Sequence, residues 1–213
     1  VTFAAQHSIG WRFFPAWLQA FETEFGPILS RLRADNLPNC VSDLMRCEVD
    51  FVLSYESRHA RGVETSPAIR SLRIGADRLV PVCKPDSTGA PQFSIDGSST
   101  APIPYLQFGP SAPIGWHVEA ILRERDLLAR LTTIYENSMA GALRIRARDG
   151  LGVAWLPLSL VHQDIDSGLL TMAGVDDWAI DVEIRLHRLE RNVNPVVRAI
   201  WTFLADRVDR PLV

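Results

Sequence analysis

Residues 1–53 read VTFAAQHSIGWRFFPAWLQAFETEFGPILSRLRADNLPNCVSDLMRCEVDFVL. Short apolar strands are expected at 1–5, 28–32 and 49–53, with amphipathic helices between them. The first of these helices has an apolar stripe at helical spacing, formed by Phe14, Leu18, Phe21 and Phe25. Because strands and helices alternate, this stretch predicts a parallel sheet with right-handed crossovers, which places the chain in the α/β class.

Short polar residues, glycine and proline mark the ends of these two helices. Ser8 or Gly10 is expected to begin the first helix, since both residue types are favoured at that position. Gly26-Pro27 is expected to end it, because glycine takes the conformation that closes a helix. Asn36 is expected to cap the second helix.

The alternation continues beyond residue 53. Further strands are expected at 79–83, 104–108, the end of 150–157 and 182–189, with a loop at 84–104. Helices are expected at 116–131, after Ser138 as a cap, and from Asn194-Pro195 onward. The closing helix has an apolar stripe formed by Val197, Ile200, Trp201, Leu204 and Val208.

The composition is that of an ordinary globular protein. Of the 213 residues 47% are hydrophobic, yet no apolar run approaches the length of about 20 residues that a membrane span needs. The net charge of −3 indicates that this segment does not bind DNA by itself. Arg144, Arg146 and Arg148 are read as a solvated helix face rather than a nucleic-acid patch.

Sequence motifs for catalysis or metal binding are not found. The five histidines are dispersed, and the three cysteines, Cys40, Cys47 and Cys83, lack the spacing of a zinc ribbon or a disulfide framework. Reduced thiols in a cytosolic protein are the simple interpretation. The sequence therefore predicts no metal, no cofactor and no enzyme activity.

Four segments, taken together, resemble the effector-binding domain of LysR-type transcriptional regulators. They are FPAWLQAF (14–21) with FGP (25–27), LMRCEVDFV (44–52), LVPVCKP (79–85), and NS (137–138) followed by GLGVAWLP (150–157) and GLL (168–170). Two positions depart from the family's pattern, which has glycine where this chain has Cys47 and near Asp35-Asn36. The turn at Cys47 is therefore expected to differ.

The resemblance implies a two-lobed, periplasmic-binding-protein-like (type 2) fold with two crossing hinge strands, near 74–79 and 182–187. Lobe I is expected to comprise 1–74 plus 186–213, and lobe II 75–185. The family's winged helix-turn-helix domain would precede residue 1, so that DNA is contacted only through that domain, in the cytoplasm and without membrane association. The alternative is a solute-binding receptor of a transport system, which has the same lobed architecture; an enzyme on a similar fold is the third reading.

The resemblance also implies a small-molecule effector in the cleft between the lobes, at strand ends and helix N-termini, where backbone N–H groups are free. These positions supply Ser8, Ile9, Asn36, Leu37, Tyr55, Phe108, Gly109, Ser111 and Ser138. For each polar residue among them, the alternative to a ligand contact is a purely structural role as a helix cap or a turn residue. Trp11 and Trp155 fit the protein core as well as the ligand wall. A carboxylate effector and a mostly apolar or aromatic one fit equally well.

A homodimer or higher homo-oligomer is a further implication of the resemblance. The helix at 14–25 is expected to pack beside the segment 116–130 of a second copy, in an antiparallel pair. Gln19, Glu22 and Thr23 face away from the apolar stripe of that helix and are available for the contact.

Overall fold

The chain folds into two compact units in a computed structural model that describes residues 1–58, 63, 67–96, 101–207 and 212. Unit 1 comprises Val1–Ala76 and Val182–Val213, and unit 2 comprises Asp77–Asp181. The two segments that connect the units are strand β4 (Ile69–Cys83) and strand β9 (Ile180–Leu189). No helix in the described part of the chain is both long enough and apolar enough to cross a membrane.

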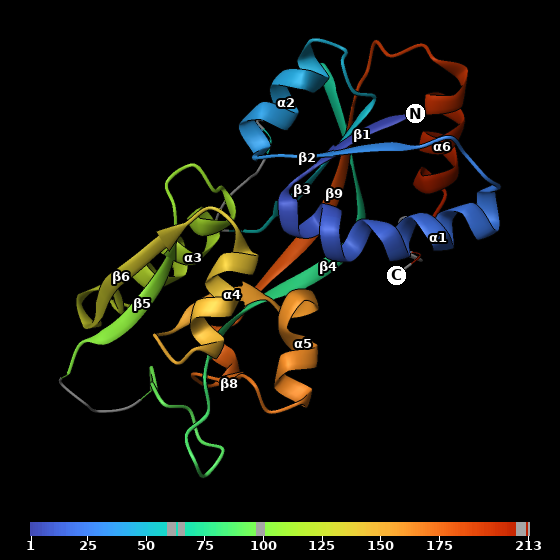
Figure 1. Ribbon diagram of the computed structural model, residues 1–213. Helices are drawn as coiled ribbons and strands as arrows, with labels where there is room; N and C mark the ends of the chain where they lie inside the picture. The colour runs from blue at the N-terminus through green and yellow to red at the C-terminus, as the bar shows by residue number, and fades with distance from the viewer. Residues whose placement is uncertain (59–62, 64–66, 97–100, 208–211, 213) are drawn as a thin grey trace. The chain divides into compact units, whose positions relative to one another are not determined.

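The sheet of unit 1 has the predicted parallel start. Its strand order is β2 (Arg31–Ala34), β1 (Thr2–Ala5), β3 (Phe51–Glu56), β9 and β4 (Figure 1). Strand β1 pairs in parallel with both β2 and β3, which confirms the β-α-β-α-β prediction, and β9 joins β3 in the antiparallel sense. The carboxyl ends of β1, β2 and β3 therefore meet at one edge of unit 1.

The first helical segment is irregular, in contrast to the single helix expected from Ser8 or Gly10. A π-helix, Ile9–Phe13, precedes α1 (Phe14–Phe25), and the N–H of Gly10 bonds to the carbonyl of Gln6 at 2.9 Å. A Cβ atom at Gly10 would lie only 3.3 Å from Leu32 of β2, so glycine lets this turn approach the sheet. Gly26 ends α1 with a φ of 104°, as predicted.

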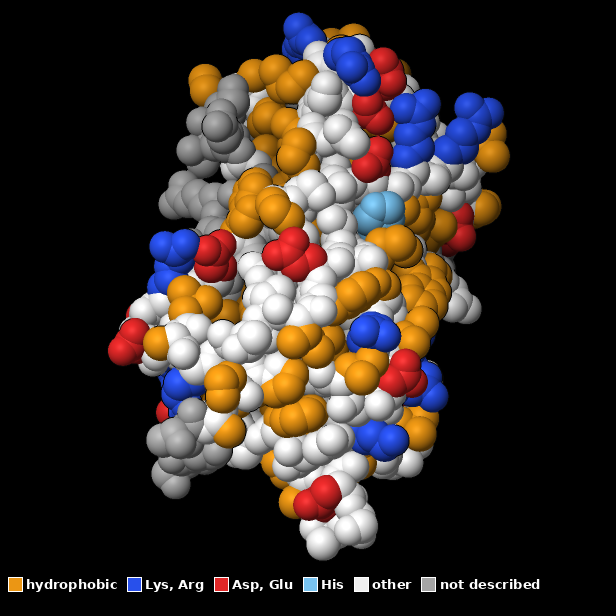
Figure 2. All heavy atoms as spheres, turned by 60° about the vertical axis from the view of Figure 1, so that its left-hand side comes forward, with side chains coloured by type: hydrophobic (Ala, Val, Ile, Leu, Met, Phe, Trp, Pro, Cys, Tyr) orange, Lys and Arg blue, Asp and Glu red, His pale blue; other side chains and the backbone are white. Residues whose placement is uncertain are grey.

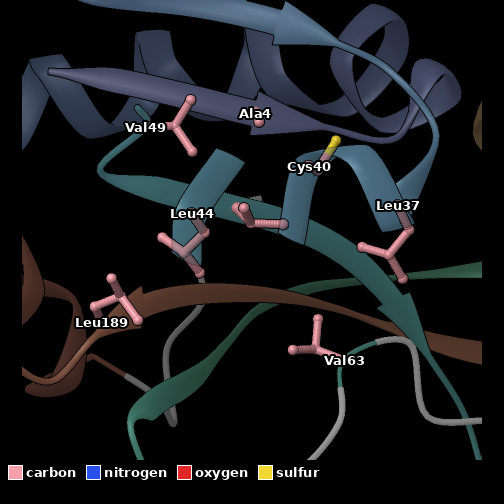
Figure 3. Packing of buried hydrophobic residues seen from close by; sticks show 8 residues of the cluster. Ala4, Leu37, Cys40, Leu44, Val49, Val63 and Leu189 are labelled. Atoms are coloured by element: carbon pink, nitrogen blue, oxygen red, sulfur yellow. The ribbon is translucent and has the colours of Figure 1, made fainter. Parts of the chain in front are cut away.

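Two helices cover opposite faces of the unit 1 sheet, because neighbouring residues of a strand point to opposite sides. Phe3 of β1 contacts Phe14 and Trp17 of α1, in an aromatic core. The next residue, Ala4, joins the cluster beneath α2 (Leu37–Met45), which Figure 3 shows: Leu37, Cys40, Leu44, Val49, Val52, Val63 and Leu189.

The closing helix α6 (Pro195–Ala205) belongs to unit 1. Asn194 caps it, since its side chain accepts a hydrogen bond from the N–H of Val196. The ring of Phe203 meets the rings of Phe21 and Phe25 edge to face, which fastens α6 to α1. Trp201 is half-buried beneath Arg188, and Val208 of the predicted stripe lies outside the described residues.

Unit 2 is built around the second half of β4. This half pairs with β7 (Ala154–Pro157) and with β8 (Thr171–Met172), both antiparallel. Strands β5 (Ile103–Phe108) and β6 (Leu131–Asn137) form a separate parallel pair. An isolated β-bridge between Tyr105 of β5 and Val153, the residue before β7, connects this pair to the rest of the unit. Helices α3 (Ile114–Glu124), α4 (Ala140–Arg148) and α5 (Leu158–Asp166) complete the unit.

Unit 2 corrects three expectations. The helix predicted at 116–131 ends at Glu124, because Asp126 takes a positive φ of 52° that an α-helix does not tolerate. Strand β6 follows instead, and neither it nor α5 was predicted. Ser138 does not cap α4; Met139 occupies that position. In unit 1, by contrast, Cys47 takes a φ of 61°, so the left-handed turn is kept without glycine.

Candidate functional site

Gln6 organises the strand ends of unit 1. Its side-chain oxygen accepts a hydrogen bond from the backbone N–H of Tyr55 at 2.7 Å, and its carbonyl accepts from Gly10. One buried amide thus holds together the end of β1, the end of β3 and the π-helix. This residue was not predicted from the sequence, although a polar side chain directly after a buried strand was a signal for it.

The predicted site residues at this edge divide into buried and exposed ones. Ile9, Leu37 and Tyr55 lie in the core, with at most 2% of each residue exposed. Trp11 is exposed to solvent over 58% of its surface. This excludes a core position for Trp11, which was one of the two alternatives, and leaves the ligand wall as the other. Ser8 is nearly buried, and no hydrogen bond of its hydroxyl is present among the described residues.

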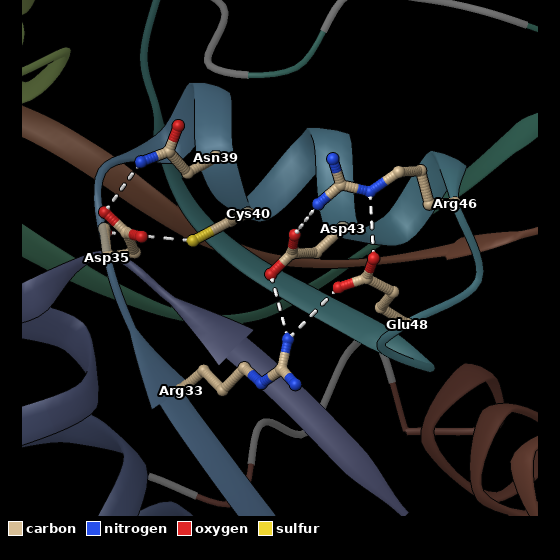
Figure 4. Close-up of polar contacts among 7 residues, drawn as sticks. All are labelled: Arg33, Asp35, Asn39, Cys40, Asp43, Arg46 and Glu48. Atoms are coloured by element: carbon tan, nitrogen blue, oxygen red, sulfur yellow. Dashed lines mark hydrogen bonds and ion pairs between the residues drawn. The ribbon is translucent and has the colours of Figure 1, made fainter.

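Asn36 stands at the N-cap of α2 as expected, but its side chain makes no capping bond. Asp35 makes the polar contacts at this helix start instead. Its Oδ1 accepts a hydrogen bond from the backbone N–H of Asn36 at 2.6 Å. It also accepts one from Asn39 Nδ2 at 3.0 Å, which Figure 4 shows. The Asn36 side chain is half-buried and is left available for another partner.

A mixed ion-pair network links α2 to strand β2 and to the turn after α2 (Figure 4). Arg33 and Arg46 each contact both Asp43 and Glu48, at 2.7–3.4 Å. The charges compensate one another, so this network gives no basic surface. Because the side chains are largely exposed, each pair contributes only about 0–1 kcal/mol to stability.

Unit 2 brings three predicted residues together. The hydroxyls of Ser111 and Ser138 lie 2.8 Å apart, and the backbone N–H of Gly109 bonds to the carbonyl of Asn137 at 3.1 Å. A Cβ atom at Gly109 would lie 3.1 Å from Ser138 Oγ, so glycine makes room for the serine pair. The pair lies just before the first turns of α3 and α4, where backbone N–H groups lack helical partners.

The predicted apolar walls of unit 2 are core residues. Phe108 and Trp155 are both buried. The Trp155 indole N–H donates to the carbonyl of Trp178 at 3.0 Å, and its ring meets Tyr105 edge to face. Trp155 is therefore a core residue, which is one of the two alternatives that the sequence left open.

A buried polar cluster in unit 1 was not predicted. His187 Nε2 of β9 lies 2.8 Å from Ser54 Oγ and 3.5 Å from Glu56 Oε1, both on β3. Burial first, and then the positive charge of Arg185, lowers the pKa of His187 to about 3, so the ring is neutral at physiological pH. Serine and carboxylate approach the same ring nitrogen, whereas a serine nucleophile activated by histidine needs the carboxylate on the other nitrogen.

Two of the three arginines of α4, Arg144 and Arg146, make specific contacts instead of forming a solvated face, which corrects the sequence interpretation for these two residues. Arg144 binds Asp164 of α5 through two parallel hydrogen bonds, of 2.5 and 2.7 Å, and Arg146 lies over the ring of Tyr135. The exposed residue between them is Ile145. Within the described ranges no group of three or more His, Cys, Asp or Glu side chains is placed to hold a metal ion.

Comparison with known proteins gives relatives along nearly the whole chain. The family described as LysR substrate binding domain matches residues 1–209. The HTH-type transcriptional regulator YjiE of Escherichia coli K12 is 25% identical over 207 residues, which cover 97% of this chain and 64% of YjiE. The HTH domain-truncated transcriptional regulator QseD of Escherichia coli O157:H7 is also 25% identical, over 97% of this chain and 81% of QseD.

Solved structures agree in fold. The regulatory domain of HypT from Salmonella typhimurium, in its apo form, superposes with a TM-score of 0.78 at 23% identity, over 98% of this chain and 95% of that one. The regulatory domain of Synechocystis CcmR, in complex with 2-PG, gives a TM-score of 0.78 at 13% identity, over 99% and 97% of the two chains. The fold is the periplasmic-binding-protein-like type 2 fold of these regulatory domains.

Proposed function

The chain belongs to the LysR substrate binding domain family, and on that basis we propose that it senses a small-molecule effector for a longer regulator that controls transcription. The family match over residues 1–209 is the observation that carries this proposal. Two further facts support it: YjiE and QseD are both named transcriptional regulators, and the CcmR domain was solved with a bound small molecule. The family is regulatory rather than catalytic.

The charge distribution supports a division of labour in such a regulator. The 213 residues carry a net charge of −3, and Figure 2 shows acidic and basic side chains intermingled on one face rather than a continuous basic stripe. Phosphate binding favours clustered Lys and Arg. We assign the DNA contacts to a helix-turn-helix segment outside these residues, and we place the regulator in the cytoplasm.

We propose that the polar strand ends described above hold the effector. In unit 2 the Ser111 and Ser138 hydroxyls lie near the N-termini of α3 and α4, and together these groups match a carboxylate or a hydroxyl group. In unit 1 the available polar groups are the side chains of Ser8 and Asn36, and the Trp11 side chain is exposed. These groups suit a small polar or acidic ligand with an apolar part.

Removal of either hydroxyl of the serine pair is expected to weaken the binding of the effector and to leave the fold intact. A metabolite library is screened by thermal shift, and any ligand that stabilises the wild type is titrated against Ser111→Ala, Ser138→Ala and the control Ser87→Ala. Each lost hydrogen bond contributes about 0.5–1.5 kcal/mol, so the Kd should rise by about 2–10-fold in the first two variants only. A verified effector that binds all three variants equally well refutes the assignment of this serine pair.

The second partner we propose is another copy of the chain. Gln19 and Thr23 are exposed on α1 and lie outside its aromatic contacts. In an antiparallel dimer they would face α3 and the following residues of the second copy. Sedimentation velocity should then give twice the chain mass of 23.8 kDa. Gln19→Lys/Thr23→Lys should shift the protein toward monomer, while Gln163→Lys, on the exposed side of α5, should not. A monomeric wild type at high concentration excludes this dimer.

A further inference from the structure

A pocket of about 390 Å³ opens on unit 2, apart from the serine pair. It lies where the end of β4, the last turn of α4 and the turn after α5 come together. Ser138 precedes the first turn of α4, whereas the pocket is at the other end of that nine-residue helix, about 13 Å away along its axis. It is therefore a separate place in unit 2.

Two cations line this pocket without a partner of their own. Lys84, at the end of β4, and Arg148, in the last turn of α4, make no ion pair within the part of the chain that the structure describes. The helix terminus explains why a basic residue is favoured at 148. It leaves the guanidinium N–H groups free, in contrast to those of Arg144, which are taken by Asp164.

Two glycines with a positive φ lie next to residues that line the pocket. Gly150, just after α4, has a φ of 80°, and a Cβ atom there would lie 3.1 Å from Lys84 Cδ. The aliphatic stem of Lys84 thus passes close to the end of α4, where the missing side chain of Gly150 leaves room for it. Gly168, with a φ of 72°, is itself part of the pocket lining.

The remaining lining makes the pocket amphipathic. Ile145 and Leu169 expose 59% and 44% of their surfaces and both face the hollow. Single exposed apolar residues are common on protein surfaces, but here two converge on one pocket with two unpaired cations. Asp149 on the rim offsets one of the two positive charges, so the lining suits a ligand with a single negative charge.

We propose that unit 2 carries a second ligand site at the C-terminal end of α4, for a small organic monoanion with an aliphatic body. The carboxylate binds Lys84 and Arg148, and the aliphatic part covers Ile145 and Leu169. The volume lies toward the small end of the range of about 300–1,000 Å³ for small-molecule pockets, which suits a medium-chain carboxylate.

The test uses octanoate as the probe, titrated into ¹⁵N-labelled protein at constant ionic strength. Octanoate at millimolar concentration should shift the amide signals around residues 145–149 and 168–169, while octylammonium, which has the same tail and the opposite charge, should not. Lys84→Gln/Arg148→Gln should bind octanoate about tenfold more weakly or worse, because charge-assisted hydrogen bonds are lost. Ile145→Ser should also weaken binding, and Arg31→Gln, an exposed arginine on β2, should leave it unchanged.

The outcomes separate this site from the serine pair. Ser111→Ala/Ser138→Ala should bind octanoate like the wild type, even if that variant loses the effector. The proposal is overturned if octanoate does not bind the wild type, if it binds the Lys84/Arg148 double variant equally well, or if octylammonium produces the same shifts.

Discussion

Asp164→Ala should lower the free energy of unfolding of unit 2 by about 3 kcal/mol, which is the lower end of the range for breaking a buried ion pair. Only 4% of the Asp164 side chain and 21% of the Arg144 side chain are exposed, and the two groups share two short hydrogen bonds. Truncation of the carboxylate leaves the guanidinium largely buried without its counter-charge. The lost bond also separates α4 from α5, which it links.

Chemical denaturation measures this effect against two controls. Asp166→Ala removes an exposed carboxylate from the same helix and should change stability by less than about 0.5 kcal/mol. Arg144→Met/Asp164→Leu removes both charges and should recover most of the loss, because no unpaired charge remains. If Asp164→Ala is as stable as Asp166→Ala, the pair does not hold these helices together.

Acidification should destabilise unit 1 through His187. The pKa of this group is lowered from 6.5 to about 3 in the folded protein, mainly by burial and then by Arg185. Between about pH 6.5 and pH 3, His187 is therefore protonated in the unfolded chain and neutral in the folded chain. Stability is complete above the unfolded pKa and falls by about 1.4 kcal/mol for each pH unit below it, until the folded pKa is reached.

The cluster explains why Glu56 does not prevent this effect. Glu56 lies 3.5 Å from His187 Nε2 and would favour a protonated ring, but it also faces the Arg185 guanidinium at 3.6 Å. Its negative charge is thus already shared with an arginine, and the desolvation of the ring prevails.

Thermal unfolding between pH 7.5 and 4.5 tests the role of His187. The melting temperature of the wild type should fall more steeply with acid than that of His187→Gln, whose amide can still bond Ser54 and has no titrating ring. By pH 4.5 the wild type should have lost about 2–3 kcal/mol more of its free energy of unfolding than His187→Gln. His162→Gln, at an exposed position of α5, should follow the wild type. Parallel curves for the wild type and His187→Gln contradict the buried neutral histidine.

Local patterns in the sequence determined the class of fold. The spacing of Phe14 and Phe21 identified α1, Gly26 identified its end, and the apolar runs around Phe3 and Phe51 identified two parallel strands. These features follow from backbone geometry and from the side of an element that is buried, both of which involve residues close in sequence. The family resemblance was carried by the same local segments and is confirmed over residues 1–209.

The candidate site was predicted only in part. The positions of Ser111 and Ser138 at strand ends were foreseen, but their 2.8 Å contact joins residues 27 positions apart. Gln6 and His187 were missed, because their importance comes from Tyr55 and Ser54, on a strand that lies far along the chain from each. The presence of a single polar residue in an apolar run does not indicate which distant atom its side chain contacts.

Where the apolar period is strong, the order of residues alone indicates which segments are strands and helices, and it also indicates which family the chain resembles. The other features depend on packing between distant segments. Strand β6 can be recognised only by its pairing with β5, and Trp11 and Trp155 have the same side chain but opposite exposure. Burial, partner atoms and the pKa of His187 are properties of the packed environment, which forms only when residues distant in the chain meet.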